Sequence, residues 1–261
     1  MAEESTILSI KHLKKDFIIK NNKVEVLEDI NLDIAKGEFI SFIGESGCGK
    51  STILKLITNL EDPTDGEITI DGEPVKAPSD KVSMIFQEAR LFPWLTVEQN
   101  IDFTISRDIP REERKKIVKK HIELVGLKGF ENAVPNQLSG GMQQRVSIAR
   151  GLATNPEILL LDEPFGALDA FTRINMQKET LSIWEKERTT MILVTHDIDE
   201  AIFLSDKIVV LSAKPGVVKE IIPVKLPRPR ERSSLEFMEL RRKVMLTLYD
   251  KEMDADIEYF I

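Results

Sequence analysis

One loop decides how this chain folds, and it reads Gly44-Glu45-Ser46-Gly47-Cys48-Gly49-Lys50-Ser51-Thr52. It fits the pattern in which a glycine is followed, after four residues, by glycine, lysine and serine or threonine. An apolar, strand-like run at 38–43 precedes the loop, and residues 53–57 continue with apolar side chains at helical spacing. A strand, this loop and a helix in that order predict a phosphate-binding site. A glycine-rich turn with a chance lysine is the alternative.

The loop has the chemistry to hold the phosphates of a nucleotide. Its glycines let successive backbone N–H groups point inward at phosphate oxygens, and the helix that follows adds the positive end of its dipole. We expect Lys50 to reach the β- and γ-phosphates and the Ser51 hydroxyl to hold Mg²⁺. All nine residues of the loop are therefore predicted to contact the nucleotide.

A second apolar run, at 158–161, ends in the acidic pair Asp162 and Glu163. The run is typical of a buried parallel strand, and such strands carry their chemistry at the carboxyl end. We predict that Asp162 supplies a carboxylate to Mg²⁺ and that Glu163 is the general base for an attacking water. An acidic strand end that only faces solvent is the alternative.

A third strand-like run, at 190–195, is followed by His196 and Asp197. A histidine at the end of a strand is often a hydrogen-bonded structural group. Because this strand is expected to lie near the one that ends in Asp162, we predict a catalytic role for His196.

Residues 138–145 read Leu138-Ser139-Gly140-Gly141-Met142-Gln143-Gln144-Arg145. We predict that Ser139 caps a helix that begins at Gly140. Because Gly140 and Gly141 have no side chains, the N–H groups of this helix start stay open to a γ-phosphate. The residues alone do not say whose phosphate that is.

Together these motifs resemble the ATP-binding cassette family of nucleotide-binding subunits, from about residue 8 to about residue 223. The resemblance rests on the order and spacing of the phosphate loop, Gln87, the signature 138–144, Asp162-Glu163, Asp169 and His196. It implies an α/β fold: a P-loop NTPase core of the RecA-like type with a mostly parallel sheet, an N-terminal antiparallel β subdomain and an inserted α-helical subdomain. It also implies that ATP and Mg²⁺ are the cofactors.

The resemblance assigns further roles. It implies that Gln87 contacts Mg²⁺ and the attacking water, that Asp169 belongs to the nucleotide site, and that Phe17 stacks on adenine. A buried structural Phe17 is the alternative. Met142 stands where the family more often has Gln, and Glu45 where many relatives have Pro. We interpret Met142 as a character of importer-type relatives, and Glu45 as a position that offers only its backbone.

The resemblance also implies partners. The signature of one copy is expected to cover the ATP of another, in a head-to-tail homodimer or paired cassette. Residues 88–97 are similar to those of importers for nitrate, sulfonates and taurine, which work with membrane permease subunits and, indirectly, with a solute-binding protein. An apolar set in this segment is expected to form a groove for a permease helix, or else to pack in the core: Leu91, Phe92, Trp94 and Leu95.

Composition limits the other function classes. The chain has 261 residues, 42% of them hydrophobic, and 36 basic against 44 acidic residues give a net charge of −8. Because it has no long basic tract, we expect no nucleic-acid partner. The single cysteine, Cys48, indicates a reducing compartment. No signal peptide or membrane span is evident, so we expect the protein at the cytoplasmic face of the cell membrane, held there by permease subunits.

The predicted organisation has four segments. Residues 7–88 form the N-terminal β region and the first part of the core, and residues 89–155 a helical subdomain with the signature. Residues 156–222 complete the core, and 223–261 form a proline-rich linker and a final helix. We also predict a hairpin turn at 20–23, a helix over 111–125, a helix at 198–204 and a strand at 207–211. The basic run at 111–120 is interpreted as a solvated face, or else as a partner surface.

Other functions stay open at this point. An ATPase of the same family that works in iron–sulfur assembly would share every nucleotide motif. A P-loop kinase fits the phosphate loop but leaves the signature unexplained. A regulatory nucleotide-binding protein would need no Glu163.

Overall fold

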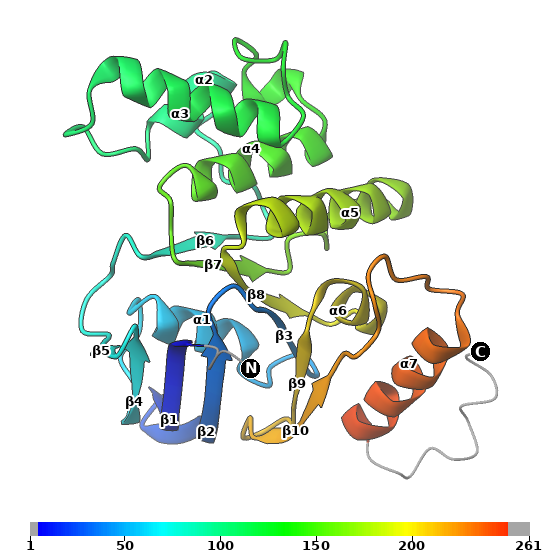
Figure 1. Cartoon of the computed structure of the whole chain (residues 1–261). Helices are drawn as coiled ribbons and strands as arrows, with labels where there is room; N and C mark the ends of the chain where they lie inside the picture. Colours follow the sequence, from blue (N-terminus) through cyan, green and yellow to red (C-terminus); the bar gives the residue numbers. More distant parts are fainter. Residues whose placement is uncertain (1–4, 250–261) are drawn as a thin grey trace. The chain divides into compact units, whose positions relative to one another are not determined.

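The computed structural model describes residues 5–249, which form two compact units (Figure 1). The first unit contains residues up to 77 and from 192 onward, and the second contains residues 78–191. Strand β8 (Thr190–Thr195), all of whose residues are buried, carries the chain from the second unit back into the first.

The first unit begins with an antiparallel sheet in the strand order β2-β1-β4-β5. Its strands are β1 (Thr6–Ile19), β2 (Asn22–Ala35), β4 (Asp65–Ile70) and β5 (Glu73–Pro74). Lys20 and Asn21 join β1 to β2 with φ angles of 48° and 63°. Two successive positive φ angles are the geometry of a tight hairpin, so the predicted turn at 20–23 is confirmed.

The same unit contains the strand that leads to the phosphate loop. Strand β3 (Phe39–Ile43) is buried at every residue and pairs in parallel with β9 (Lys207–Leu211), which pairs antiparallel with β10 (Val218–Pro223). The helices of this unit are α1 (Lys50–Ile57), α6 (Ile198–Leu204) and α7 (Leu235–Leu248). The predicted strand at 207–211 and helix at 198–204 are confirmed.

The final helix packs as its apolar spacing predicts. Phe237, Val244 and Leu248 are buried on one side of α7, while Leu240 is half-buried. Helix α7 contacts α6, β9 and β10. The last part of the predicted segment 223–261, beyond residue 249, lies outside the described residues.

The second unit pairs strand β6 (Val82–Ile85) in parallel with β7 (Ile158–Asp162). Its helices are α2 (Val97–Asp102), α3 (Arg111–Leu124), α4 (Gly140–Leu152) and α5 (Ala170–Glu187), with a short 3₁₀ turn, η1 (Pro135–Gln137). Helix α4 packs against α2, α3, α5 and β6 (Figure 1). The predicted helix over 111–125 and the strand at 158–161 are confirmed.

The predicted α/β class is confirmed, with a largely parallel core and a separate antiparallel sheet. The four segment boundaries stay a prediction, although three helices of the second unit, α2, α3 and α4, fall within 89–155. Between residues 5 and 249, no helix has the length and apolar character needed to cross a membrane.

Candidate nucleotide site

The phosphate loop connects β3 to α1 in the first unit. Gly47 and Gly49 have φ angles of 82° and 94°, a region that glycine enters without a steric penalty. They allow the backbone to wrap between the end of β3 and Lys50, the first residue of α1. Ser51 is exposed at the second position of the helix. The loop therefore has the strand, turn and helix start that binding of phosphate groups needs.

The ammonium group of Lys50 lies inside this loop. Its Nζ donates hydrogen bonds to the carbonyl oxygens of Gly44 at 2.6 Å and Glu45 at 3.0 Å, and the side chain is buried. A buried cation at the start of a helix provides an attractive potential for an anion. This geometry fits a triphosphate in the loop.

Gly216, which lies outside the motif, packs against the backbone of the loop. The N–H of Gly216 donates to Val26 at 2.9 Å, and the carbonyl of Gly216 accepts from the N–H of Glu28 at 3.0 Å. A β-carbon at residue 216 would lie 2.2 Å from the carbonyl oxygen of Cys48, a backbone atom of the loop. This close approach requires glycine at residue 216, and no sequence motif predicted it.

In the second unit, β7 brings Asp162 and Glu163 to its carboxyl end. Asp162 is the last residue of the strand and is half-buried. Glu163 has a φ of 46°, an uncommon conformation for a residue with a side chain, between Asp162 and the buried Pro164. Such local strain is frequent at functional sites.

Gln87 lies against the turn that follows Glu163. A β-carbon on Gly166 would be 3.0 Å from Nε2 of Gln87, and the N–H of Gly166 donates to the carbonyl of Glu163 at 3.1 Å. The structure thus brings Gln87 and the Glu163 turn together. The oxygen ligands predicted for Mg²⁺ suit a hard cation: the hydroxyl of Ser51, the amide of Gln87 and the carboxylate of Asp162. Their metal role stays a prediction.

Two polar side chains of α4 hold the segment on both sides of Gln87. Nε2 of Gln144 donates to the carbonyl of Phe86 at 3.2 Å, and the guanidinium of Arg150 donates to the carbonyls of Ala89 and Arg90 at 3.0 and 2.9 Å. The signature helix is therefore bonded directly to the Gln87 loop. Gln144 belongs to the signature, whereas no sequence signal pointed to Arg150.

The signature itself has the predicted helix start. The hydroxyl of Ser139 accepts the N–H of Met142 at 3.3 Å, and α4 begins at Gly140, so the predicted cap is confirmed. A β-carbon on Gly141 would lie 2.8 Å from the Thr172 methyl group of α5. Ser139 and Gly140 are exposed, whereas Gly141 is buried. An approaching anion can thus reach the first turn of the helix.

Asp169 caps α5 beside the signature. Its carboxylate accepts the N–H groups of Phe171 at 3.1 Å and Thr172 at 3.0 Å. Hydrogen bonds from Thr172, above all from its side chain, hold the pKa of Asp169 below its ordinary value. Asp169 is therefore fixed as an anionic cap; its contact with a nucleotide stays a prediction.

His196 belongs to the first unit and lies between β8 and α6. The chain on either side is rigidly bonded: the Thr195 hydroxyl donates to the carboxylate of buried Glu200 at 3.1 Å, and Asp197 caps α6 by accepting the N–H of Glu200 at 3.1 Å. The His196 side chain is exposed. The hydrogen bonds on both sides therefore hold the backbone of His196 in place, while its imidazole remains accessible at the end of β8.

Phe17 is half-buried near the end of β1, and the ammonium of Lys15 lies 4.6 Å from its ring centroid. The ring thus makes a cation–π contact on one side. Stacking of Phe17 on adenine stays a prediction. Among the predicted residues, the first unit contains the loop 44–52, Phe17 and His196, and the second contains Gln87, Ser139, Gly140, Gly141, Asp162, Glu163 and Asp169.

Residues 27–166 match the model of the ABC transporter family. The chain belongs to this family. ATP is thereby the nucleotide that this chain binds. The match spans the phosphate loop, the Gln87 segment, the signature and the Asp162-Glu163 pair.

Individual relatives extend the likeness beyond that range. The aliphatic sulfonates import ATP-binding protein SsuB of Bacillus cereus is 54% identical over 238 residues, which cover 91% of this chain and 94% of that protein. The bicarbonate transport ATP-binding protein CmpC of Synechococcus elongatus is 51% identical over 87% of this chain and 35% of its own length. A dimeric post-hydrolysis structure of the cassette MJ0796, bound to ADP and Pi, aligns with a TM-score of 0.72 at 34% identity, over 85% of this chain and 100% of that one.

Proposed function

We propose that this chain is the ATP-hydrolysing subunit of an importer and that two copies close head to tail on two ATP molecules. The observation that carries the proposal is that one chain has both a phosphate loop with a buried lysine and a capped, glycine-rich helix start open to an anion. A single phosphate site needs only the first. The MJ0796 cassette, whose post-hydrolysis structure is dimeric, supports a pairing of two copies.

In this proposal the bound ATP with Mg²⁺ supplies the γ-phosphate that water attacks. The loop N–H groups and Lys50 hold the β- and γ-phosphates, and Ser51, Gln87 and Asp162 are the residues that would hold the metal. Glu163 accepts the proton of the attacking water, and the imidazole of His196 acts on the γ-phosphate. The signature of the second copy, at Ser139 and the glycines, completes the site.

The cargo is proposed to be a small solute of the nitrate, sulfonate and taurine class. The support is the name of the SsuB relative, which covers nearly all of this chain. The CmpC relative is nearly as similar and is named for bicarbonate, another small anion. A solute-binding protein is expected to deliver the solute to the permease subunits, through which it crosses the membrane. This chain is expected to bind those subunits at the cytoplasmic face.

The segment after Gln87 is the proposed permease contact. Trp94 is 72% exposed, and its ring lies 5.7 Å from that of Phe92, which in turn lies 4.6 Å from that of Phe103. The buried Asn100 holds this segment, because its amide donates to the carbonyls of Phe92, Leu95 and Thr96 at 3.0–3.2 Å. An exposed aromatic surface held by these hydrogen bonds is suited to receive an apolar helix face.

Phosphate release from ATP with no added acceptor tests the proposed activity. We expect Glu163→Gln to lower kcat by about a hundredfold or more, since a positioned general base contributes on that scale, while ATP still binds. Glu185→Gln is the matched control, because Glu185 is exposed on α5. Turnover at the wild-type rate in Glu163→Gln would refute the role of Glu163. Formation of ADP only when an acceptor is added, with the phosphate transferred to that acceptor instead of released, would favour a kinase.

A further inference from the structure

Helix α6, which begins two residues after His196, is too short to be stable alone. It has seven residues, and isolated helices of this length do not persist in water. The last four carbonyl groups of any helix lack partners inside it. In α6 the carbonyl of Ala201 accepts the N–H of Ser205 at 3.0 Å. The other three carbonyls, of residues 202–204, need donors from elsewhere.

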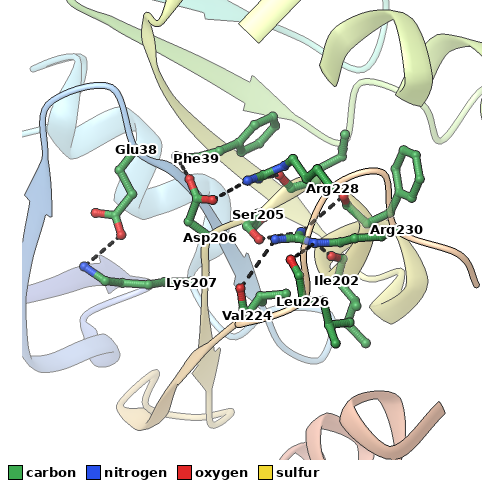
Figure 2. A network of polar contacts seen from close by, with 12 residues as sticks. Glu38, Phe39, Ile202, Ser205, Asp206, Lys207, Val224, Leu226, Arg228 and Arg230 are labelled. Atoms are coloured by element: carbon green, nitrogen blue, oxygen red, sulfur yellow. Dashed lines mark hydrogen bonds and ion pairs between the residues drawn. The ribbon is translucent and has the colours of Figure 1, made fainter. Parts of the chain in front are cut away.

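Two arginines of a distant segment supply these donors (Figure 2). One terminal nitrogen of Arg230 donates to the carbonyls of Ile202 at 2.6 Å and Phe203 at 3.2 Å. The guanidinium of Arg228 donates to the carbonyl of Leu204 at 2.6 Å. The segment 224–230, called the strap below, therefore completes the carboxyl end of α6.

The strap is itself fixed by the same side chains. Arg230 also donates to the carbonyls of Ser205, Leu226 and Val224 at 2.7, 3.1 and 3.4 Å. Arg228 pairs at 2.6 Å with Asp206, whose other oxygen accepts the N–H of Phe39 at 3.0 Å. Figure 2 shows both guanidinium groups between the strap and the chain after α6. The strap is thus tied to α6 and to the strand that leads to the phosphate loop.

The charge of Arg230 suits this position. Its side chain is 6% exposed, and burial lowers the pKa of its guanidinium to about 10, so the group stays protonated at neutral pH. A cation at the carboxyl end of a helix is favoured by the helix dipole. The hydrogen bonds to five carbonyl oxygens offset the cost of burying the charge.

The opposite end of α6 meets the strand end that presents His196. Asp197 and Glu200 bond to each other and to Thr195, so a shift of α6 moves the residues on both sides of His196. Helix α7 adds a further tie, because Arg241 pairs with Asp199 at 3.0 Å. Helix α6 thus connects the strap to the chain around His196.

We propose that Arg230 is a positioning residue for ATP hydrolysis. It holds α6 and thereby fixes the position from which His196 acts on the γ-phosphate. The proposal rests on the proposed function, in which His196 acts on the γ-phosphate. Arg230 touches neither nucleotide nor metal in this proposal. Its loss is therefore expected to lower kcat and to leave the KM for ATP almost unchanged.

The test compares ATP hydrolysis by Arg230→Met, Arg230→Lys and the control Arg242→Met, whose side chain is exposed on α7. We expect Arg230→Met to lower kcat about two- to thirtyfold, the range for residues that act through a neighbour. Lysine keeps one cationic donor, so Arg230→Lys should recover part of the loss. If Arg230→Met does not fold, Arg230→Lys and Arg228→Met provide the comparison. A wild-type kcat in these folded variants, or a change in KM alone, would overturn the proposal.

The background of His196→Ala separates this proposal from the proposed function. If Arg230 acts through His196, Arg230→Met lowers kcat in the wild type but causes little further loss in His196→Ala. An equal loss in both backgrounds would overturn the positioning role. A wild-type kcat in His196→Ala alone would instead refute the proposed role of His196. Thermal unfolding of each variant shows whether a change in kcat accompanies a change in folding.

Discussion

A methyl group on Gly216 has no space, because the neighbouring carbonyl of Cys48 is part of the phosphate-loop backbone. The loop motif specifies how the backbone wraps around a phosphate, but its position also depends on Gly216 and on the strand residues Val26 and Glu28. Backbone atoms cannot move aside as a flexible side chain can. At the scale of the residue, the backbone position of the phosphate loop therefore depends on a glycine outside the motif.

We predict that Gly216→Ala lowers the free energy of unfolding by about 1–3 kcal/mol, as overpacking of a tight site does, and weakens ATP binding. Urea unfolding and equilibrium ATP titration measure the two effects. Lys214→Gln, an exposed change in the same loop, is the control. If Gly216→Ala kept the wild-type unfolding free energy and the wild-type affinity for ATP, the close packing of residue 216 on the Cys48 carbonyl would be contradicted.

Elements with a regular apolar pattern were predictable from the sequence. The spacing within 111–125 and the strand-like runs on both sides of 20–23 are local signals, and the structure has the helix and the hairpin there. Prolines predicted an extended segment after residue 223, and residues 224–230 have no regular structure. The role of its arginines was not predictable, because their partners in α6 lie 24–28 residues earlier in the chain. A side-chain bond to a distant carbonyl leaves no local pattern.

The candidate site divides in the same way. Residues that are predicted to contact a nucleotide follow motifs, so the loop, Asp162, Glu163 and the signature were identified from spacing. Residues that support them, such as Gly216, Arg150 and Arg230, make contacts that only the folded chain creates.

Helix α3 carries a pH-dependent contribution to stability. His121 is buried on α3, and Nδ1 of its ring lies 2.8 Å from the carbonyl of Ile117. Burial lowers the pKa of His121 below its ordinary value, and the nearby charge of Lys120 acts in the same direction. Below the ordinary pKa the unfolded chain binds more protons at this site than the folded chain, so stability is lost as the pH falls through that window.

We predict that wild-type protein loses more unfolding free energy than His121→Gln when the pH is lowered from about 7.5 to about 5.5, a range that spans the ordinary pKa of histidine. Glutamine keeps an N–H donor for Ile117 but does not titrate. Urea unfolding at several pH values measures the difference. Parallel pH profiles for the two proteins would refute a buried neutral His121.

At the scale of the whole molecule, the account depends on two copies. Each copy has a phosphate loop in its first unit and a signature helix in its second, and Ser139 and Gly140 are exposed at that helix start. In the proposal, each ATP molecule lies between the phosphate loop of one copy and the signature helix of the other. Closure of the pair then requires ATP, and hydrolysis, with Glu163 as the general base, reopens it.

The most direct measurement is the molar mass of Glu163→Gln by light scattering, with ATP and Mg²⁺ and then with ADP. Because this variant binds ATP but hydrolyses it slowly, closed pairs should accumulate. The account predicts a mass of twice 29.7 kDa with ATP and of 29.7 kDa with ADP. A single-copy mass at saturating ATP, with binding confirmed by titration, would contradict it.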